Sequence, residues 1–251
     1  MPRFKLTIAY DGTNYAGWQV QPGLQTVQQK VEEAIAATVG AEVKLHGSGR
    51  TDRGVHARGQ VAHFDAETRM SAKSMMLALN SRLPTDIRIL ADEIVADDFH
   101  ARRSATAKEY RYVVWNGPVM PPQERLYALL VHRPLDMPLV RDGARRFIGE
   151  HDFVAFMANP QRTLETTVRT IYEFEVTKHG RRITFRVKGS GFLYKQVRSM
   201  VGMLIRVGTA AEKAERITEL LDTSAPRTAH VPSAPPQGLT LWKVWYASEM
   251  I

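Results

Sequence analysis

The sequence predicts an α+β fold with two similar lobes, each built from a mostly antiparallel sheet with helices on its outer face. Three observations support this prediction. Segments of strand-like alternation are mixed with segments of helical period, short turns join the strands with few β-α-β crossovers, and 251 residues suit two modest domains. A basic connector leads into a strand near residue 105, so we expect lobes at 1–105 and 106–251.

Local signals mark each element of the first lobe. Residues 4–10 alternate between apolar and polar, and Thr26 opens a capping box before a helical run that Gly40 stops. The expected elements are a strand at 4–10, a helix at 27–39, strands at 43–46 and 60–65, a helix that Ser71 caps and Pro84 ends, and a strand at 87–90.

The second lobe shows the same mixture of strand and helix signals. His179-Gly180 is a turn between two alternating segments and indicates a hairpin. The expected elements are a strand within 99–115, a helix at 139–148, hairpin strands at 171–176 and 182–188, helices at 193–207 and 211–221, and a strand at 241–246.

Composition narrows the class of protein and its partners. The chain has no cysteine, which excludes a thiol nucleophile, a thiolate metal site and a disulfide framework. The N-terminus does not resemble a signal peptide, and no apolar run approaches the roughly 20 residues that cross a bilayer. We therefore expect a soluble, cytoplasmic protein that does not span a membrane. The net charge of +8 favours a polyanionic partner, and composition alone does not separate nucleic acid from an anionic membrane surface.

The segment GSGRTDRGVHARG, residues 47–59, is the main candidate site. It seats one carboxylate, Asp52, among glycines and arginines. A turn aspartate is the simplest interpretation, but Arg50 and Arg53 are close enough in sequence to pair with Asp52 and favour its charged form. Glycine leaves space for a bulky ligand, and arginine binds phosphate. The pattern therefore suits chemistry on a nucleotide, with the acid as nucleophile or base.

Other site types fit the sequence less well. His46, His56 and His63 do not have the spacing of a chelating pair on one helix face, so we expect no metal. The segment also differs from the phosphate-binding and dinucleotide-binding glycine motifs, so no nucleotide cofactor is expected.

Several further residues are candidates for RNA contact, each with a plain structural alternative. Tyr110 lies in an expected strand, where its ring either packs in the core or provides a surface on which a base stacks. Residues 99–103 are a solvated connector or an aromatic and basic RNA contact. The basic face of strand 182–188 either pairs with Glu173 and Glu175 or meets RNA backbone. Arg198, off the apolar stripe of its helix, is a surface residue or a partner of Asp52.

At this point the chain resembles a known family. GRTDRGVHARGQVAHF, residues 49–64, is similar to the catalytic motif of the tRNA pseudouridine synthase A (TruA) family. The resemblance continues in order through YDGTNYAGWQVQP, ALNSRLPTDIRI, FHARRSATAKEYRY, GEHDFVAF, GFLYKQVRSMVGMLIRVG and PPQGLTLW, and so covers nearly the whole chain.

The resemblance implies a pseudouridine synthase fold with the active-site cleft between the lobes, no metal or cofactor, and a homodimer that binds tRNA through its anticodon arm. It implies isomerisation of uridine to pseudouridine at tRNA positions 38, 39 and 40, a tRNA modification that needs base flipping. The implied roles are a catalytic nucleophile, Asp52; substrate-binding residues Arg50, Tyr110, Arg198 and Leu239; and RNA-binding or loop-supporting residues Arg53, His56 and Arg58, with the RNA-contacting segment Phe99, His100, Ala101, Arg102 and Arg103.

Two other functions are compatible with the same residues. A uridine N-glycosidase would use Asp52 but release the base, and a non-catalytic RNA-binding module would use residues 49–59 only to hold phosphate. For the isomerase, the carboxylate can stabilise charge at the anomeric carbon, form a covalent adduct or take a sugar proton, and the sequence leaves these routes open.

Overall fold

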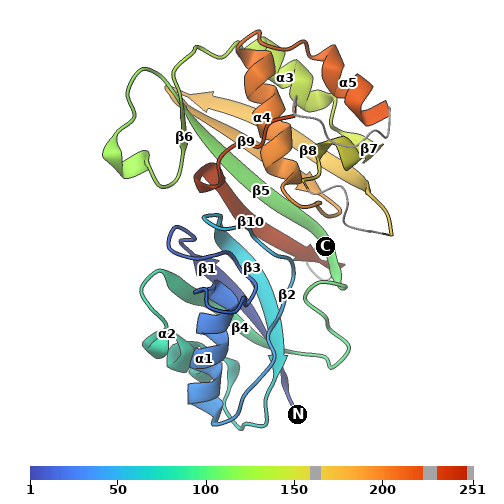
Figure 1. Cartoon of the computed structure of the whole chain (residues 1–251). Coiled ribbons are helices and arrows are strands. Elements are labelled where there is room, and N and C mark those ends of the chain that lie inside the picture. The colour runs from blue at the N-terminus through green and yellow to red at the C-terminus, as the bar shows by residue number, and fades with distance from the viewer. Residues whose placement is uncertain (159–164, 223–230, 248–251) are drawn as a thin grey trace. The chain divides into compact units, whose positions relative to one another are not determined.

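The computed structural model describes residues 1–158, 165–222 and 231–247 (Figure 1). They form two compact units. The first unit contains Met1–Thr106 together with the segment that begins at Thr240, and the second unit is Ala107–Leu239. Mixed helices and mostly antiparallel strands in both units confirm the expected α+β class.

The first unit is a sheet with two helices on one face (Figure 1). Its strand order is β4-β1-β3-β10, and β2 also pairs with β3. The β1 pairings are antiparallel and the β3–β10 pairing is parallel. The elements are β1 (Arg3–Tyr10), α1 (Val27–Val39), β2 (His46–Gly47), β3 (His56–Asp65), α2 (Ala72–Arg82), β4 (Ile87–Val95) and β10 (Leu239–Tyr246).

The capping signals of α1 operate as expected. The Thr26 hydroxyl accepts a hydrogen bond from the Gln29 amide, and Gly40 ends the helix in the left-handed conformation with φ 76°. The Gln29 side chain does not complete the capping box, since it donates to Glu33 instead. The capped helix buries Val31 and Ile35 in the core.

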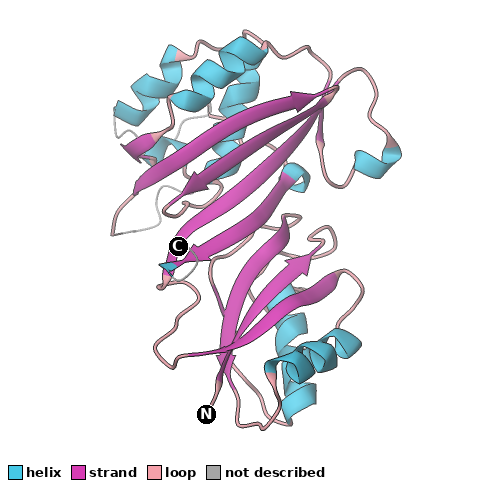
Figure 2. Ribbon diagram, turned by 180° about the vertical axis from the view of Figure 1, so that it is seen from behind, coloured by secondary structure: helices cyan, strands magenta, loops and turns pink. Residues whose placement is uncertain are grey.

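The second unit has a sheet of order β5-β9-β8-β7, all antiparallel, with β6 parallel to β5. Its helices lie on one face of that sheet (Figure 1), and Figure 2 shows the opposite face of each sheet in front. The elements are β5 (Ala105–Asn116), β6 (Leu129–Val131), α3 (Met137–Arg145), β7 (Gly149–Asp152), β8 (Val168–His179), β9 (Arg182–Gly189), α4 (Gln196–Gly208) and α5 (Glu215–Asp222), with short 3-10 helices at Pro122–Glu124, Val154–Phe156 and Pro236–Gly238.

Aromatic residues dominate the core of the second unit. Phe147 packs edge-to-face on Phe156 with ring centroids 5.0 Å apart, and Phe153 and Phe174 also contact its ring. Such pairs add stabilisation beyond the area that they bury.

Two expected strands near the candidate loop have different bounds in the structure. The strand expected at 43–46 is reduced to β2, because side chains of α1 bind the backbone of Leu45: Glu32 accepts from its amide and Gln28 donates to its carbonyl. The strand expected from residue 60 starts at His56, because β1 and β10 pair with its first residues. Both differences come from contacts distant in sequence.

Helix bounds in the second unit also shift. The expected helix 139–148 is α3, Met137–Arg145, because Asp136 caps it by accepting from the Leu139 amide. The expected helix 211–221 starts at Glu215, since Ala210 takes a left-handed conformation (φ 55°) and Ala211 still donates back to Arg206 of α4.

The last strand departs from the expected lobe division. We expected residues 106–251 to form the C-terminal lobe, but β10 from Thr240 onward belongs to the first unit. The reason is its parallel pairing with β3, Thr240 opposite His56 and Leu241 opposite Ala57. The chain therefore returns to the unit that carries Asp52.

Candidate active site

Two buried polar side chains fix the start of the loop that carries Asp52. The Ser48 hydroxyl donates to the Gln60 side-chain oxygen at 2.7 Å, and the Gln60 amide nitrogen donates to the Gly49 carbonyl at 2.9 Å. Ser48 and Gln60 are both fully buried. A buried hydrogen-bonded pair of this kind is costly to disrupt, so the loop is held to β3.

The backbone on both sides of Asp52 is also held. The Tyr10 and Thr51 hydroxyls are hydrogen-bonded at 2.7 Å, the Trp18 amide donates to the Thr51 carbonyl, and the Val55 amide donates to the Asp52 carbonyl. Burial raises the pKa of Tyr10, so its hydroxyl keeps its proton at neutral pH. The Asp52 side chain is half-buried. A positioned loop therefore presents a carboxylate that a substrate can reach.

Gly17 brings a second segment against this loop. Its φ of 102° disfavours any other residue, and a Cβ atom there would lie 2.6 Å from the Thr51 carbonyl oxygen. Sequence reasoning did not assign Tyr10, Gly17, Trp18 or Gln60 to the site. The available signal was the glycine and aromatic content of YDGTNYAGW, next to the first strand.

The basic residues of the loop differ in exposure. Arg50, Arg53 and Arg58 are exposed, whereas His56 is only 3% exposed. The Nδ1 atom of His56 accepts a hydrogen bond from the Gly12 amide at 3.0 Å. Because the ring is enclosed and bonded to the Gly12 amide, the structure favours the loop-supporting alternative for His56 over RNA contact.

The segment Phe99–Arg103 is a tight turn on the first unit. His100 Nδ1 accepts from the amides of Arg102 and Arg103 at 3.1 and 3.4 Å. Burial lowers the pKa of His100, and the nearby Arg103 acts in the same direction, so its ring favours the neutral form that accepts these bonds. Both arginines are exposed, and Phe99 is half-buried. The turn thus directs two cations to the surface.

Ala101 anchors this turn, and its side chain is fully buried. Its amide donates to His63 Nδ1 at 3.2 Å, and its carbonyl accepts from the Tyr246 hydroxyl at 2.7 Å. Both backbone groups are used inside the unit, which favours a supporting role for Ala101 over the expected RNA contact.

Three expected substrate-binding residues belong to the second unit. Tyr110 on β5 packs edge-to-face on Phe192, with centroids 5.2 Å apart. Arg198 on α4 is 9% exposed, and its Nε donates to the Ala234 carbonyl at 2.7 Å, while the Ala234 amide donates back to the Arg198 carbonyl. Leu239, the first residue of β10, is buried. A surface position for Arg198 is excluded, and its pairing with Asp52 stays a prediction.

The basic face of β9 carries ion pairs. Arg186 contacts Glu109, Glu173 and Glu175 at 3.1, 2.9 and 3.3 Å, and Lys188 lies 3.7 Å from Glu173. These contacts favour the structural alternative for this strand over RNA contact.

The described residues contain neither a metal-site arrangement nor a helix that could span a membrane. Within 1–158, 165–222 and 231–247, no group of three histidine and carboxylate side chains has the arrangement of a metal site. Over the same residues, no helix combines the length and the apolar character that crossing a bilayer requires.

The arrangement as a whole, a half-buried Asp52 on a fixed loop with exposed arginines close to it in sequence, is suited to chemistry on a nucleotide by a carboxylate. Comparison with known proteins gives the family. Residues 6–102 and 144–247 match the family model described as tRNA pseudouridine synthase.

Relatives of near-identical length support the same family. The tRNA pseudouridine synthase A 2 of Clostridium perfringens is 45% identical over 98% of this chain and 100% of its own. The tRNA pseudouridine synthase A of an Exiguobacterium species is 46% identical, covering 98% of each chain, and that of Maridesulfovibrio salexigens is 45% identical, covering 98% of this chain and 91% of its own.

The chain therefore belongs to the tRNA pseudouridine synthase family, which confirms the expected resemblance. It is an isomerase of the class that converts uridine to pseudouridine in tRNA.

Proposed function

We propose that this chain isomerises uridine to pseudouridine at positions 38, 39 and 40 of the tRNA anticodon arm, with Asp52 as the nucleophile. The observation that carries the proposal is the reachable Asp52 carboxylate on a loop held from both sides by buried hydrogen bonds. Catalytic groups need this kind of fixed geometry.

The reaction needs three changes in the substrate. The bond from C1′ to N1 of uracil breaks, the base turns, and a bond forms from C1′ to C5. The proton that C5 loses is matched by the proton that N1 gains, so atoms balance without a second reactant. Asp52 supports the first step by attaching to C1′, by stabilising positive charge there, or by taking a sugar proton.

The other proposed residues hold the flipped nucleotide. Arg50 is exposed beside Asp52 and is suited to a phosphate of the displaced nucleotide. Tyr110 offers a ring for the base, and Arg198 and Leu239 complete the binding residues contributed by the second unit. Flipping costs a few kcal/mol, which stacking and pocket contacts offset.

The central experiment compares Asp52→Asn with the unchanged protein on total tRNA that lacks pseudouridine. We expect tRNA binding within about twofold and a loss of turnover of at least about a thousandfold, because the nucleophile is gone. Asp222→Asn, at an exposed position at the end of α5, is the matched control and should be fully active.

The same experiment separates the alternatives. Pseudouridine mapped at positions 38, 39 and 40 supports the proposal, while free uracil would identify an N-glycosidase. Full turnover by Asp52→Asn would remove Asp52 from the nucleophile role, and tRNA binding with no change in any nucleotide would indicate a binding module.

Arg50→Ala gives an independent test of flipping. We expect at least about tenfold slower pseudouridine formation with an unchanged unfolding midpoint, because Arg50 is exposed and makes little contribution to the core. An equal fall in stability and activity would show a structural role.

The assembly and location are part of the same proposal. The family resemblance supports a homodimer that works on tRNA in the cytoplasm. Light scattering on the purified protein, with and without tRNA, measures the number of subunits.

A further inference from the structure

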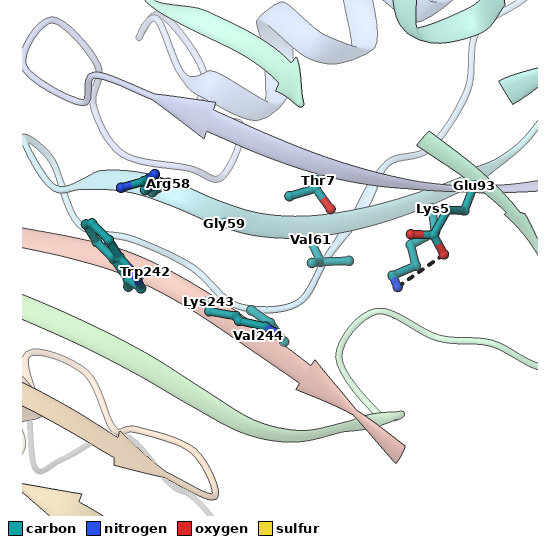
Figure 3. Close-up of a pocket in the computed structure, with 9 residues that line it drawn as sticks. All are labelled: Lys5, Thr7, Arg58, Gly59, Val61, Glu93, Trp242, Lys243 and Val244. Atoms are coloured by element: carbon teal, nitrogen blue, oxygen red, sulfur yellow. Dashed lines mark ion pairs between the residues drawn. The ribbon is translucent and has the colours of Figure 1, made fainter. Parts of the chain in front are cut away.

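A groove lies on the face of the first unit's sheet opposite α1 and α2 (Figure 3). Its volume is about 350 Å³, and β1, β3, β4 and β10 all contribute to its walls. Its lining residues are Lys5, Thr7, Arg58, Gly59, Val61, Glu93, Trp242, Lys243 and Val244. We call it the basic groove, because three of these residues are cations and one is a carboxylate.

One end of the basic groove is built around Arg58. Its guanidinium carbon lies over the Trp242 ring, 4.5 Å from the centroid, and Figure 3 shows the two side chains next to each other. This cation–π contact restrains the guanidinium at the edge of the groove, where its N–H groups can meet a planar anion. Gly59 permits this geometry, since a Cβ atom there would lie 2.6 Å from the Trp242 carbonyl oxygen and force β10 away from β3.

The other end is built around Lys5. Its side chain is 8% exposed, its Nζ lies 3.6 Å from Glu93, and it sits 4.9 and 5.8 Å from the ring centroids of Tyr246 and Phe99. A cation enclosed by aromatic rings keeps a strong local field, because little water screens it. Glu93 is 57% exposed and so neutralises Lys5 only partly.

The basic groove connects two surfaces that are already candidates for RNA contact. Arg58 lies six residues after Asp52 along the chain, and Lys5 reaches Phe99 of the Phe99–Arg103 turn. From Arg58 to His63, β3 extends about 17 Å at ~3.3 Å per residue, enough for a few nucleotides.

We propose that the basic groove binds the phosphodiester backbone of the tRNA a few nucleotides away from the target uridine. The proposal rests on the proposed function of the Asp52 loop. Arg58 and Lys243 contact phosphate directly, Trp242 holds the Arg58 plane, and Lys5 adds a fixed positive charge. Glu93 opposes binding, because it places a carboxylate beside the phosphates.

Four substitutions test this arrangement in equilibrium binding of an unmodified tRNA transcript over a series of KCl concentrations. Arg58→Gln and Lys243→Gln should each raise Kd about three- to tenfold and reduce the salt slope by about 1. Glu93→Gln should lower Kd by a similar factor. Lys73→Gln removes an exposed cation from α2, on the helical face, and should leave Kd unchanged.

Glu93→Gln keeps the test decisive even where another variant folds poorly, since a damaged protein does not bind more tightly. The proposal is overturned if Arg58→Gln and Lys243→Gln bind like Lys73→Gln, or if Glu93→Gln weakens binding. A change in subunit number by light scattering, with unchanged tRNA affinity, would assign the groove to a second copy of the chain and also overturn it.

Turnover at saturating tRNA separates this proposal from the proposed function. The Lys243→Gln and Glu93→Gln variants, which lie outside the Asp52 loop, should form pseudouridine at the normal maximal rate, because they act on binding alone. If neither the unchanged protein nor any variant forms pseudouridine, but the Kd values change as predicted, the proposed reaction is wrong and the proposed role of the groove is supported. If pseudouridine forms at the normal rate but the Kd is the same for all variants, the proposed reaction is supported and the proposed role of the groove is wrong.

Discussion

The faces opposite the helices differ sharply between the two units. On the second unit, three cations, Arg111, Arg186 and Lys188, lie against three carboxylates, Glu109, Glu173 and Glu175. The lining of the basic groove in the first unit includes three cations and one carboxylate, Glu93.

The difference teaches that a basic strand pattern does not by itself indicate RNA contact. In both units, arginine and lysine lie on strands in which polar and apolar residues alternate, or on a strand next to such a strand. Only the neighbouring strands decide whether a carboxylate stands opposite each cation. A face on which cations outnumber carboxylates is suited to a polyanion.

The largest expected effect concerns how the folding stability of the first unit depends on pH through His63. Burial lowers the pKa of His63 to about 4; His100, His46 and Arg3 act in the same direction and Asp65 opposes them. The unfolded chain binds a proton at this site below about pH 6.5 while the folded one does not, so stability falls as pH drops from about 6.5 to about 4.

Chemical unfolding at pH 4.5 and pH 7 measures this contribution, which is at most about 3 kcal/mol. His63→Gln should flatten the pH dependence, because an amide oxygen still accepts from the Ala101 amide but does not titrate. His132→Gln, at an exposed position, is the control. An unchanged slope in His63→Gln would place the acid sensitivity elsewhere.

The next prediction disrupts the ion pairs on the sheet face of the second unit. The Glu109 side chain is 3% exposed and accepts hydrogen bonds from Arg111 at 2.7 Å and Arg186 at 3.1 Å. Glu109→Gln should cost about 2 kcal/mol of unfolding free energy, because two charged hydrogen bonds are weakened. tRNA affinity should not change.

Glu219→Gln is the control for Glu109→Gln. It alters the exposed pair with Arg216 and should cost less than about 0.5 kcal/mol. Weaker tRNA binding by Glu109→Gln, with the fold intact, would contradict a structural role for this face.

The smallest expected effect concerns Asp92, an enclosed carboxylate that differs from Glu109 in its hydrogen-bond partners. Both oxygens of Asp92 on β4 are buried, and no side chain in the described part of the chain donates to them. Burial raises the pKa of Asp92 to about 7. Because the folded chain holds this proton more tightly than the unfolded one, the site's contribution to stability is lost as pH rises from about 4 through 7.

Asp92→Asn should therefore raise the unfolding free energy at pH 8 by about 1 kcal/mol, and by less at pH 5, because it removes a charge that burial disfavours. Urea unfolding at the two pH values measures the difference. Destabilisation of Asp92→Asn at pH 8 would show that the charged carboxylate has a stabilising partner.

The sequence by itself determined the elements whose signals are local. The alternation of residues 4–10, the Thr26 cap and Gly40 stop of α1, and the Ser71 cap of α2 all operate through neighbours in the chain. The motif around Asp52 was equally local, but it left the reaction open, and the family resemblance needed the further motifs along the chain.

Tertiary structure alone decided how those elements serve the site. The start of β3 at His56 and the return of β10 to the first unit depend on strand pairing between distant residues. His56 and Ala101 are buried against segments that are distant in sequence. The Gly12 amide bonds to His56, and the Tyr246 hydroxyl bonds to Ala101.

The basic groove shows the limit most clearly. Lys5, Arg58, Glu93 and Lys243 come from four strands, and their sum of charge exists only where the sheet brings them together. A sequence lists the charges in order along the chain, but electrostatic interaction depends on distance in space, which only the fold sets.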